Sequence, residues 1–367
     1  ELERRRRVVH RGLDRHDGQE VAGVQIEHRS TLELHEVLAR MKDDQVDTVC
    51  MEVSSHALEQ RRTAGLQFDL GLFTNLTHDH LDYHQDMEAY FQAKKRLFFP
   101  DQGKRPFPVV NLDDAAGRRL ASLCETGLGF ALEDGEASGF DCLQGRLKRL
   151  DREGLELEMR LRGTCWSLQS SLIGRHNASN LLAVQAVGCR LGLSPEELQV
   201  LSDFPGVPGR LERVEGIGPG YVFIDYAHTP DALQNVLRSI RELDFQRVIA
   251  VFGCGGNRDR QKRPLMGQVV AAQADVAVLT SDNPRDEDPL AIMADIRPGL
   301  KGAPRIIEEP ERGRAIELAL HEACPGDALI IAGKGHETYQ EIKGVKYPFS
   351  DRDVVLQLAG GADARLF

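Results

Sequence analysis

The sequence of 367 residues predicts an α/β protein of two domains, the second of which is a Rossmann-like, doubly wound sheet. After about residue 220, segments with strand and helix patterns alternate strictly, which favours a mostly parallel sheet. The segment 203–210, DFPGVPGR, is rich in proline and glycine and marks the expected boundary. The second domain is therefore predicted to be 207–367.

The elements expected in the second domain follow one another without interruption. The predicted strands are 221–228, 247–256, 275–281, 305–307 and 327–333. The predicted helices are 230–243, 264–273, 288–297, 311–323 and 351–358. In an open sheet of this kind, ligands bind outside the carboxyl ends of the strands. The loops that follow these strands are therefore the expected location of a site.

The first domain, 31–206, combines helices with buried strands and a hairpin. Helix patterns begin at residues 31 and 194 and also cover 86–98 and 177–191. Apolar runs predict buried strands at 46–53, 68–76 and 107–112. In 154–172, apolar residues alternate with charged ones around an Arg162-Gly163 turn, which predicts an antiparallel hairpin with one exposed face.

Composition argues against several classes of protein. The net charge of −11 is unfavourable for general nucleic-acid binding. No apolar run approaches the roughly twenty residues of a membrane span, and no signal peptide is visible. The 7 cysteines are scattered without Cys-x-x-Cys spacing, as is typical of reduced thiols. We therefore expect a cytoplasmic monomer without a nucleic-acid or membrane partner.

Residues 1–30 differ from the rest of the chain. A basic run from Arg4 to Arg7 is followed by few large apolar residues. A basic arm would explain this composition, but a truncated or mis-specified start explains it better. We expect 1–30 to be an atypical segment that packs poorly.

Ligand-type side chains are densest between Thr74 and Phe98, where His80 and Lys94 occur. Glu52 closes an apolar run just upstream, so its carboxylate can reach a cation at the edge of a sheet. We expect these three side chains to form one site. A zinc hydrolase is the alternative, because His78, His80, Asp82 and His84 are spaced almost as in binuclear zinc sites. However, Tyr83 separates the last two residues and would turn His84 away.

Three polar loops follow strands of the second domain. They are 253–260, which is rich in glycine and carries Arg258, 282–285, which has the sequence DNPR, and 333–337, which ends at Glu337. Pro284 stiffens its turn, so that Asn283 and Arg285 face outward, and an arginine fork matches a carboxylate. Loops at the carboxyl ends of one sheet face one crevice, and these charges suit a zwitterion such as an amino acid.

Several segments of the chain resemble the Mur ligases in order and spacing. They are MEVSSHALEQRR, FTNLTHDHLDYH, AYFQAKKRLF, GRHNASN, PGRLE, DYAHTPD, FGCGGNRDRQKRPLM, SDNPRDEDP and AGKGHETYQ. The resemblance covers about residues 31 to 367. It is greatest to the members that add the third residue to UDP-N-acetylmuramoyl-L-alanyl-D-glutamate, and DNPR resembles the motif of those that take meso-diaminopimelate.

The resemblance implies roles for individual residues. It implies that Glu52, His80 and Lys94 are catalytic and hold Mg²⁺, with Lys94 carbamylated so that it offers the oxygen ligand that Mg²⁺ prefers. The implied UDP-substrate contacts are Ser54 and Arg62. The implied ATP contacts are Asn177, Asn180, Arg210, Asp225 and His228. The implied diaminopimelate contacts are Arg258, Asn283, Arg285, Gly333 and Glu337.

The implied reaction is ATP-driven amide formation in peptidoglycan precursor synthesis. The glutamyl carboxylate of the UDP-N-acetylmuramoyl-dipeptide takes the γ-phosphoryl group, the amine of meso-diaminopimelate attacks the acyl phosphate, and phosphate leaves. ATP and Mg²⁺ are the implied cofactors. The domain 31–206 would be the central ATPase domain, and 207–367 would bind the amino acid.

One part of the family's pattern is not found. A phosphate-binding G-x-x-G-K-[ST] loop is expected before Thr31, and Gly333-Lys334-Gly335 lacks its hydroxyl residue and spacing. We therefore expect the ATPase domain to lack its P-loop and the chain to show weak or no ATP turnover. The alternative function is a catalytically inactive fragment that only binds an amino acid.

Overall fold

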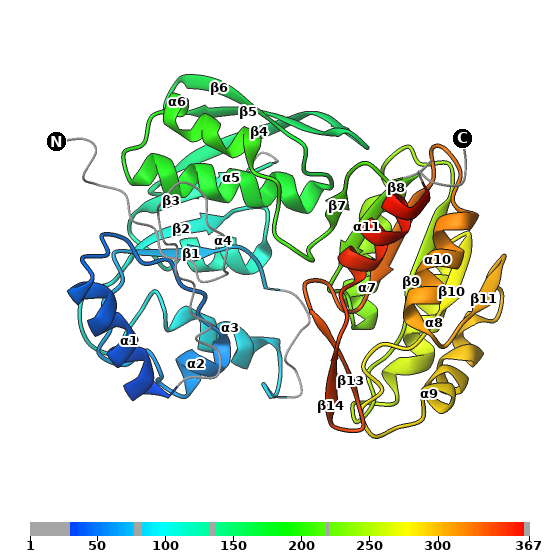
Figure 1. Cartoon of the computed structure of the whole chain (residues 1–367). Helices are drawn as coiled ribbons and strands as arrows, with labels where there is room; N and C mark the ends of the chain where they lie inside the picture. The colour runs from blue at the N-terminus through cyan, green and yellow to red at the C-terminus, as the bar shows by residue number, and fades with distance from the viewer. Residues whose placement is uncertain (1–29, 77–82, 133–134, 136, 218–219, 363–367) are drawn as a thin grey trace. The chain divides into compact units, whose positions relative to one another are not determined.

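The computed structural model describes residues 30–76, 83–132, 135, 137–217 and 220–362 (Figure 1). The strands form two six-stranded sheets, with the orders β1-β2-β3-β4-β5-β6 and β11-β10-β9-β12-β8-β7, and a two-stranded sheet, β13-β14. The chain divides into two compact units. The amino-terminal unit comprises the described residues within Glu1–Arg146, Met159–Cys165 and Asn180–Leu198, and the carboxyl-terminal unit those within Leu147–Glu158, Trp166–Ser179 and Gln199–Phe367.

The first half of the chain contains the elements of the first sheet. Its strands are β1 (Leu70–Phe73), β2 (Phe107–Asn111), β3 (Gly127–Ala131), β4 (Phe140–Asp151), β5 (Gly154–Leu161) and β6 (Thr164–Ser170). Its helices are α1 (Thr31–Asp43), α2 (Ser55–Glu59), α3 (Met87–Lys95), α4 (Ala115–Ala121), α5 (Arg175–Arg190), α6 (Pro195–Leu198) and the 3₁₀ helix η2 (Gln199–Asp203). The predicted 154–172 hairpin is confirmed as β5 and β6, because Arg162 and Gly163 form the turn between them.

The second half contains the second sheet and the small hairpin. The strands are β7 (Glu212–Val214), β8 (Tyr221–Asp225), β9 (Val248–Phe252), β10 (Val276–Leu279), β11 (Ile306–Glu308), β12 (Ala328–Ala332), β13 (Tyr339–Ile342) and β14 (Val345–Pro348). The helices are α7 (Pro230–Arg241), α8 (Lys262–Gln273), α9 (Pro289–Ile296), η3 (Arg297–Leu300), α10 (Arg312–Glu322) and α11 (Asp351–Ala362).

The predicted doubly wound, mostly parallel sheet is confirmed in the carboxyl-terminal unit. Strand β12 lies between β8 and β9 and runs parallel to both, while β9, β10 and β11 continue in parallel. Strand β7 pairs antiparallel with β8 at one edge. The carboxyl ends of β8, β9, β10 and β12 therefore meet at the same edge of the sheet, and this arrangement brings distant loops together.

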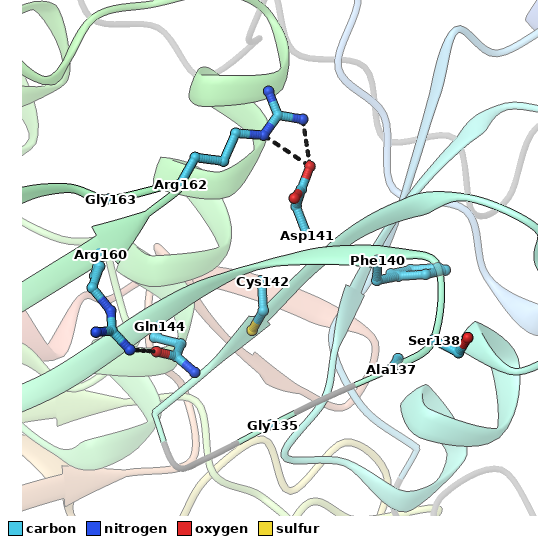
Figure 2. A pocket seen from close by; sticks show the side chains of 10 residues that line it. All are labelled: Gly135, Ala137, Ser138, Phe140, Asp141, Cys142, Gln144, Arg160, Arg162 and Gly163. Carbon is cyan, nitrogen blue, oxygen red and sulfur yellow. Dashed lines mark hydrogen bonds and ion pairs between the residues drawn. The ribbon is translucent and has the colours of Figure 1, made fainter.

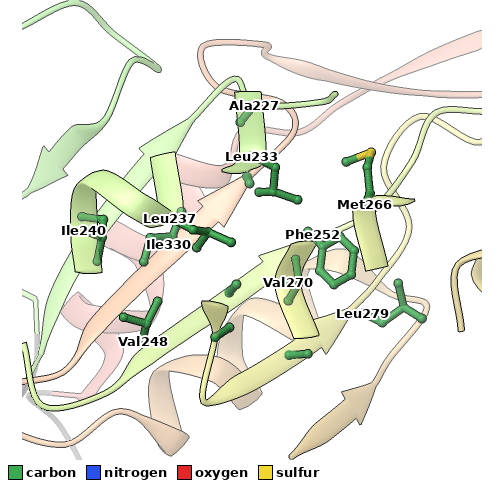
Figure 3. Close-up of a cluster of buried hydrophobic side chains, with 14 of the residues drawn as sticks. Ala227, Leu233, Leu237, Ile240, Val248, Phe252, Met266, Val270, Leu279 and Ile330 are labelled. Atoms are coloured by element: carbon green, nitrogen blue, oxygen red, sulfur yellow. The ribbon is translucent and has the colours of Figure 1, made fainter. Parts of the chain in front are cut away.

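Apolar residues cover both faces of this sheet. On one face, Leu233, Leu237 and Ile240 recur along α7 at helical spacing and pack with residues of α8 and α9 against the sheet (Figure 3). Residues of α10 and α11 pack against the other face. Helices on both faces bury the central strands β9 and β12 completely, as their continuous apolar sequences require.

The structure differs from the predicted elements in several places. The helices α2 and α4 and the strands β3, β4 and β7 were not predicted. The apolar run 46–53 forms only a single-residue bridge, at Thr48, in place of the predicted strand, and Val49 is 41% exposed. An apolar run forms a strand only where a neighbouring ladder satisfies its backbone groups. The hairpin β13–β14 was not predicted, since its strands are mainly exposed and carry no clear apolar pattern.

No helix in the part of the chain that the structure describes combines the length and the apolar character that a membrane span needs.

Candidate functional site in the carboxyl-terminal unit

A hydrogen-bonded cluster joins the loops that follow β10 and β12. Asn283 donates from Nδ2 to Oε2 of Glu337 over 2.8 Å. Lys334 donates from Nζ to Asn283 Oδ1 over 3.1 Å and to Glu337 Oε2 over 3.0 Å. The Lys334 side chain is fully buried, whereas that of Glu337 is 19% exposed. The ammonium group therefore fixes both neighbours from inside the fold. No sequence motif indicated a role for Lys334.

Arg285 is held by the hairpin β13–β14 as well as by its own turn. Its backbone N–H donates to the Glu341 carbonyl over 3.0 Å, and its carbonyl accepts from the Lys343 N–H over 2.6 Å. Its φ angle of 51° lies in the left-handed region, which carries strain for a residue with a side chain. The guanidinium donates from Nη1 to the Gly256 carbonyl over 2.8 Å. The arginine is therefore fixed at both backbone and side chain.

The glycine-rich loop after β9 contacts the DNPR turn directly. The Gly256 N–H donates to the Asn283 carbonyl over 2.9 Å. A Cβ atom at Gly256 would lie 1.9 Å from the Pro284 carbonyl oxygen, so only glycine allows this approach. At Gly255, a Cβ atom would have Arg285 Nη1 at 2.8 Å and Arg258 Cγ at 3.9 Å. The two predicted arginines thus flank one glycine.

A buried arginine ties these two loops to the helices behind them. Arg263 is 0% exposed and donates to both carboxylate oxygens of Glu287, over 2.8 and 2.9 Å, and to Asp295 over 2.9 Å. Glu287 also accepts from the Asn257 N–H over 2.6 Å. The Arg263 guanidinium, helped by this N–H, lowers the pKa of the Glu287 carboxyl to about 2.

This low pKa predicts a pH-dependent loss of stability in acid. A carboxyl whose pKa falls on folding stabilises the fold above its ordinary value of 4.5, and the contribution disappears as the pH falls towards about 2. We expect Glu287→Gln to lower the melting temperature at pH 7 and to lose this difference from wild type between pH 4.5 and 2. Thermal denaturation across this pH range tests the expectation, and an equal difference at all pH values would contradict it.

A second cluster surrounds Asp225 at the end of β8. Its carboxylate is 6% exposed and accepts from the N–H groups of Leu211, over 2.7 Å, and Ala227, over 2.8 Å. Burial raises the pKa of the Asp225 carboxyl, although these two N–H groups oppose the change. The carboxylate ties residue 211 to the strand end, and this places the neighbouring Arg210.

Arg210 and His228 meet around one aromatic ring. The Arg210 guanidinium lies 5.2 Å from the centroid of the Tyr226 ring, and the His228 ring lies 4.7 Å from it. The His336 ring, from the loop after β12, lies 5.7 Å away. Three of the predicted ATP contacts, Arg210, Asp225 and His228, are therefore neighbours. Tyr226 joins them and was missed, because an aromatic residue in a strand pattern is usually assigned to the core.

The loop after β12 links the two clusters. The Gly333 N–H donates to the Asp225 carbonyl over 3.0 Å, and four residues later Glu337 contacts Asn283. A Cβ atom at Gly209 would lie 2.2 Å from the His336 backbone nitrogen, so the 209–211 segment and this loop are in close contact. The loop after β12 therefore contacts residues of both clusters at one edge of the sheet.

The remaining predicted ATP contacts lie on α5. Asn177 donates from Nδ2 to the Ile173 carbonyl over 2.9 Å, which engages its amide with the preceding turn. Asn180 lies one turn further along the same helix and is exposed. Residues three apart on a helix share a face, so the two asparagines are neighbours along α5.

In the amino-terminal unit, the predicted UDP-substrate residues have local partners. The Ser54 hydroxyl accepts from the Ala57 N–H over 3.2 Å and caps α2. Arg62 donates from Nε to Gln60 Oε1 over 2.9 Å, and Gln60 donates to the Tyr83 hydroxyl over 3.3 Å. The cap and the Gln60 contacts orient Ser54 and Arg62 at the two ends of one short segment.

The predicted metal site is described only in part. Glu52 is exposed just before α2, and Lys94 lies in the last turn of α3, with Nζ 5.2 Å from the centroid of the Tyr90 ring. His80 lies outside the described residues, as do His78 and Asp82 of the zinc alternative. Among the residues that are described, no three histidine, cysteine, aspartate or glutamate side chains converge as metal ligands.

His84 has a clear place in the amino-terminal unit. Its ring is 3% exposed, lies 2.9 Å from the Ser55 hydroxyl and 3.3 Å from Glu59 Oε2, and stacks on Tyr90 at 4.9 Å. The imidazole therefore connects both ends of α2 to α3. Its burial between helices depends on tertiary contacts, and no sequence pattern indicated it.

A hollow of about 620 Å³ in the amino-terminal unit contains none of the predicted site residues (Figure 2). Two arginines face it, but both have acceptors. Arg160 donates to Gln144 over 2.6 Å, and Arg162 donates from Nε to Asp141 over 2.8 Å. We therefore place the candidate site at the sheet edge rather than in this hollow.

Two domains of one protein family match this chain. The Mur ligase middle domain matches residues 12–188, and the Mur ligase glutamate ligase domain matches residues 209–335. The chain belongs to the Mur ligase family. The second match includes both clusters of the carboxyl-terminal unit except His336 and Glu337, which follow residue 335.

Individual Mur ligases are similar over most of this chain. UDP-N-acetylmuramoyl-L-alanyl-D-glutamate–2,6-diaminopimelate ligase of Lawsonia intracellularis is 53% identical over 90% of this chain, which spans 68% of that protein. The ligase of the same name from Synechococcus elongatus is 46% identical over 88% of this chain, which spans 64% of that protein. A solved structure of a ligase of this name has a TM-score of 0.65 at 34% identity, covering 94% of this chain and 70% of its own.

Proposed function

We propose that the chain belongs to an ATP-dependent ligase that adds meso-diaminopimelate to UDP-N-acetylmuramoyl-L-alanyl-D-glutamate in peptidoglycan precursor synthesis. The cluster of Asn283, Lys334 and Glu337, flanked by Arg285, carries this proposal. Its charges alternate at hydrogen-bonding distances, as a zwitterionic amino acid requires. The names of the relatives that are 53% and 46% identical support the same substrate.

Each end of the amino acid has suitable partners among these loops. Arg285 and Arg258 lie beside Gly255 and offer N–H donors to a carboxylate. Glu337 offers carboxylate oxygens to an ammonium group, and Lys334 and Asn283 hold it in place. Gly333 allows the close approach of the Asp282 carboxylate, because a Cβ atom there would lie 2.4 Å from Oδ2. The attacking amine is then positioned by residues that cannot move independently.

The second cluster is proposed to hold ATP. Arg210 and His228 would contact the phosphates and Asp225 the ribose, with Asn177 and Asn180 near the adenine. Ser54 and Arg62 would hold the UDP-muramoyl-dipeptide. In this proposal, 31–206 is the ATPase domain and 207–367 the amino-acid domain. The cations neutralise charge while the γ-phosphoryl group moves to the glutamyl carboxylate and the amine then displaces phosphate.

Magnesium is proposed at Glu52, His80 and a carbamylated Lys94. The carboxylate of Glu52 is an oxygen donor of the kind that Mg²⁺ prefers, whereas a lysine ammonium has no lone pair and becomes a ligand only as a carbamate. When bound, the ion neutralises phosphate charge. The exposed position of Glu52 leaves its carboxylate accessible to such an ion.

Ligand titration tests the amino-acid site directly. The chain is titrated with meso-diaminopimelate and, separately, with L-lysine, and binding is followed by ligand-observed NMR, which measures millimolar dissociation constants. We expect tighter binding of meso-diaminopimelate, because lysine lacks the second carboxylate for Arg285. Equal affinities, or tighter binding of lysine, would contradict the proposed substrate.

A binding module without turnover is a second candidate. The residues proposed to bind the amino acid all lie within the carboxyl-terminal unit, and the contacts that organise them come from that unit. Such a site needs no ATP to bind an amino acid. ATP-dependent consumption of meso-diaminopimelate in the presence of the UDP-dipeptide separates the two candidates, since binding without consumption favours the module.

A further inference from the structure

Arg285 already has a carboxylate partner within the chain. Its Nε atom lies 3.3 Å from Oε2 of Glu341 on β13, and the two side chains are 23% and 26% exposed. Glu341 was not among the residues that the sequence indicated. An arginine proposed to receive a substrate carboxylate is therefore paired with a protein carboxylate first.

The position of Glu341 does not depend on this ion pair. Its backbone N–H donates to Asn283 Oδ1 over 3.0 Å, and its carbonyl accepts from the Arg285 N–H over 3.0 Å. Next to it, Gln340 donates from Nε2 to the Asp282 carbonyl over 2.6 Å. The hairpin is thus held on the DNPR turn by backbone and amide contacts. These contacts hold the hairpin in place without the carboxylate of Glu341.

The guanidinium keeps a free side for a ligand. Nε faces Glu341 and Nη1 donates to the Gly256 carbonyl, while no described residue accepts from Nη2. A substrate carboxylate that reaches Nη2 must lie near the negative charge of Glu341. Its binding is weakened because the like charges repel and because Glu341 already neutralises the arginine.

We propose that Glu341 is a specificity-determining residue, which competes with the distal carboxylate of the incoming amino acid for Arg285. This inference rests on the proposed function. Without the Glu341 charge, the proposed amino-acid site is more positive by one unit, which favours a dicarboxylic amino acid and disfavours lysine. Glu341 therefore limits both the affinity for meso-diaminopimelate and its discrimination from lysine.

The test uses the whole chain and two substitutions at Glu341. Glu341→Gln keeps an oxygen that can accept from Arg285 Nε but removes the charge, and Glu341→Met removes both at similar length. We expect each to bind meso-diaminopimelate roughly two- to fivefold tighter than wild type, the range for a partly exposed ion pair, while lysine binding is unchanged or weaker. The gain shrinks as ionic strength rises. Glu317→Gln, which removes an exposed pair with Arg314, is the matched control and leaves both affinities unchanged.

The outcomes separate this inference from the proposed function. If Glu341 only supports the hairpin, both substitutions weaken meso-diaminopimelate binding and lower the melting temperature, which overturns the inference. Arg285→Ala is measured in parallel. If wild type binds and Arg285→Ala does not, but Glu341→Gln binds no tighter than wild type, the inference alone is wrong. If binding is undetectable, or is insensitive to Arg285→Ala, the proposed amino-acid site itself is wrong.

Discussion

Replacing Lys334 by methionine is expected to weaken the binding of meso-diaminopimelate by roughly 10- to 100-fold, the range for a lost charge-assisted hydrogen bond. Lys334 is the buried cation that donates to both Asn283 and Glu337. Methionine fills nearly the same space, so the packing is retained while both hydrogen bonds are lost. Glu337 Oε2 then keeps only its hydrogen bond from Asn283, so its carboxylate is held less firmly in the orientation that receives an ammonium group.

Lys346→Met is the matched control for this substitution. The Nζ atoms of Lys334 and Lys346 lie 5.7 and 4.0 Å from the centroid of the Tyr339 ring, but Lys346 belongs to the exposed strand β14. Ligand-observed NMR titration of both variants with meso-diaminopimelate, with melting temperatures measured alongside, tests the expectation. Wild-type affinity in Lys334→Met, or an equal loss in Lys346→Met, would show that Lys334 does not organise the site.

The sequence was sufficient to predict the sheet and the edge where the loops meet. Continuous apolar runs such as 248–252 and 328–332 identify strands buried on both faces, and the intervening helix patterns impose parallel connections. Because loops at the carboxyl ends of such strands converge, Asn283 and Glu337 were expected to be neighbours. The structure confirms this, since Asn283 Nδ2 lies 2.8 Å from Glu337 Oε2. Their role in binding stays a prediction.

Contacts that depend on tertiary packing could not be predicted. The hairpin β13–β14 has exposed strands, and its register on Arg285 is set by backbone hydrogen bonds that any sequence could make. Lys334 and His84 are polar residue types that are usually exposed or half-buried, yet both are buried because partners from distant segments surround them. In contrast, the apolar run 46–53 forms only a single-residue bridge, at Thr48.

Replacing Asp351 by asparagine is expected to destabilise the carboxyl-terminal unit by about 3–5 kcal/mol, because it leaves a buried arginine without its counter-charge. Arg312 and Asp351 are both fully buried and form two hydrogen bonds of 2.7 Å. Arg312 Nη2 also donates to the Ala332 carbonyl over 3.0 Å. This pair therefore connects α10 and the first residue of α11 to the end of β12, where the site loop begins.

A double substitution distinguishes the loss of charge pairing from the loss of packing. Arg312→Met with Asp351→Leu replaces both charges by apolar groups, and buried ion pairs exchanged in this way often lose little stability. We expect the double variant to recover most of the stability that Asp351→Asn loses, as measured by urea denaturation and by hydrogen exchange of the β12 amides. If Asp351→Asn costs under about 1 kcal/mol, water reaches the guanidinium and the pair is not buried in solution. If only the double variant unfolds, the hydrogen bond to the Ala332 carbonyl, rather than the charge of Asp351, holds the end of β12 in place.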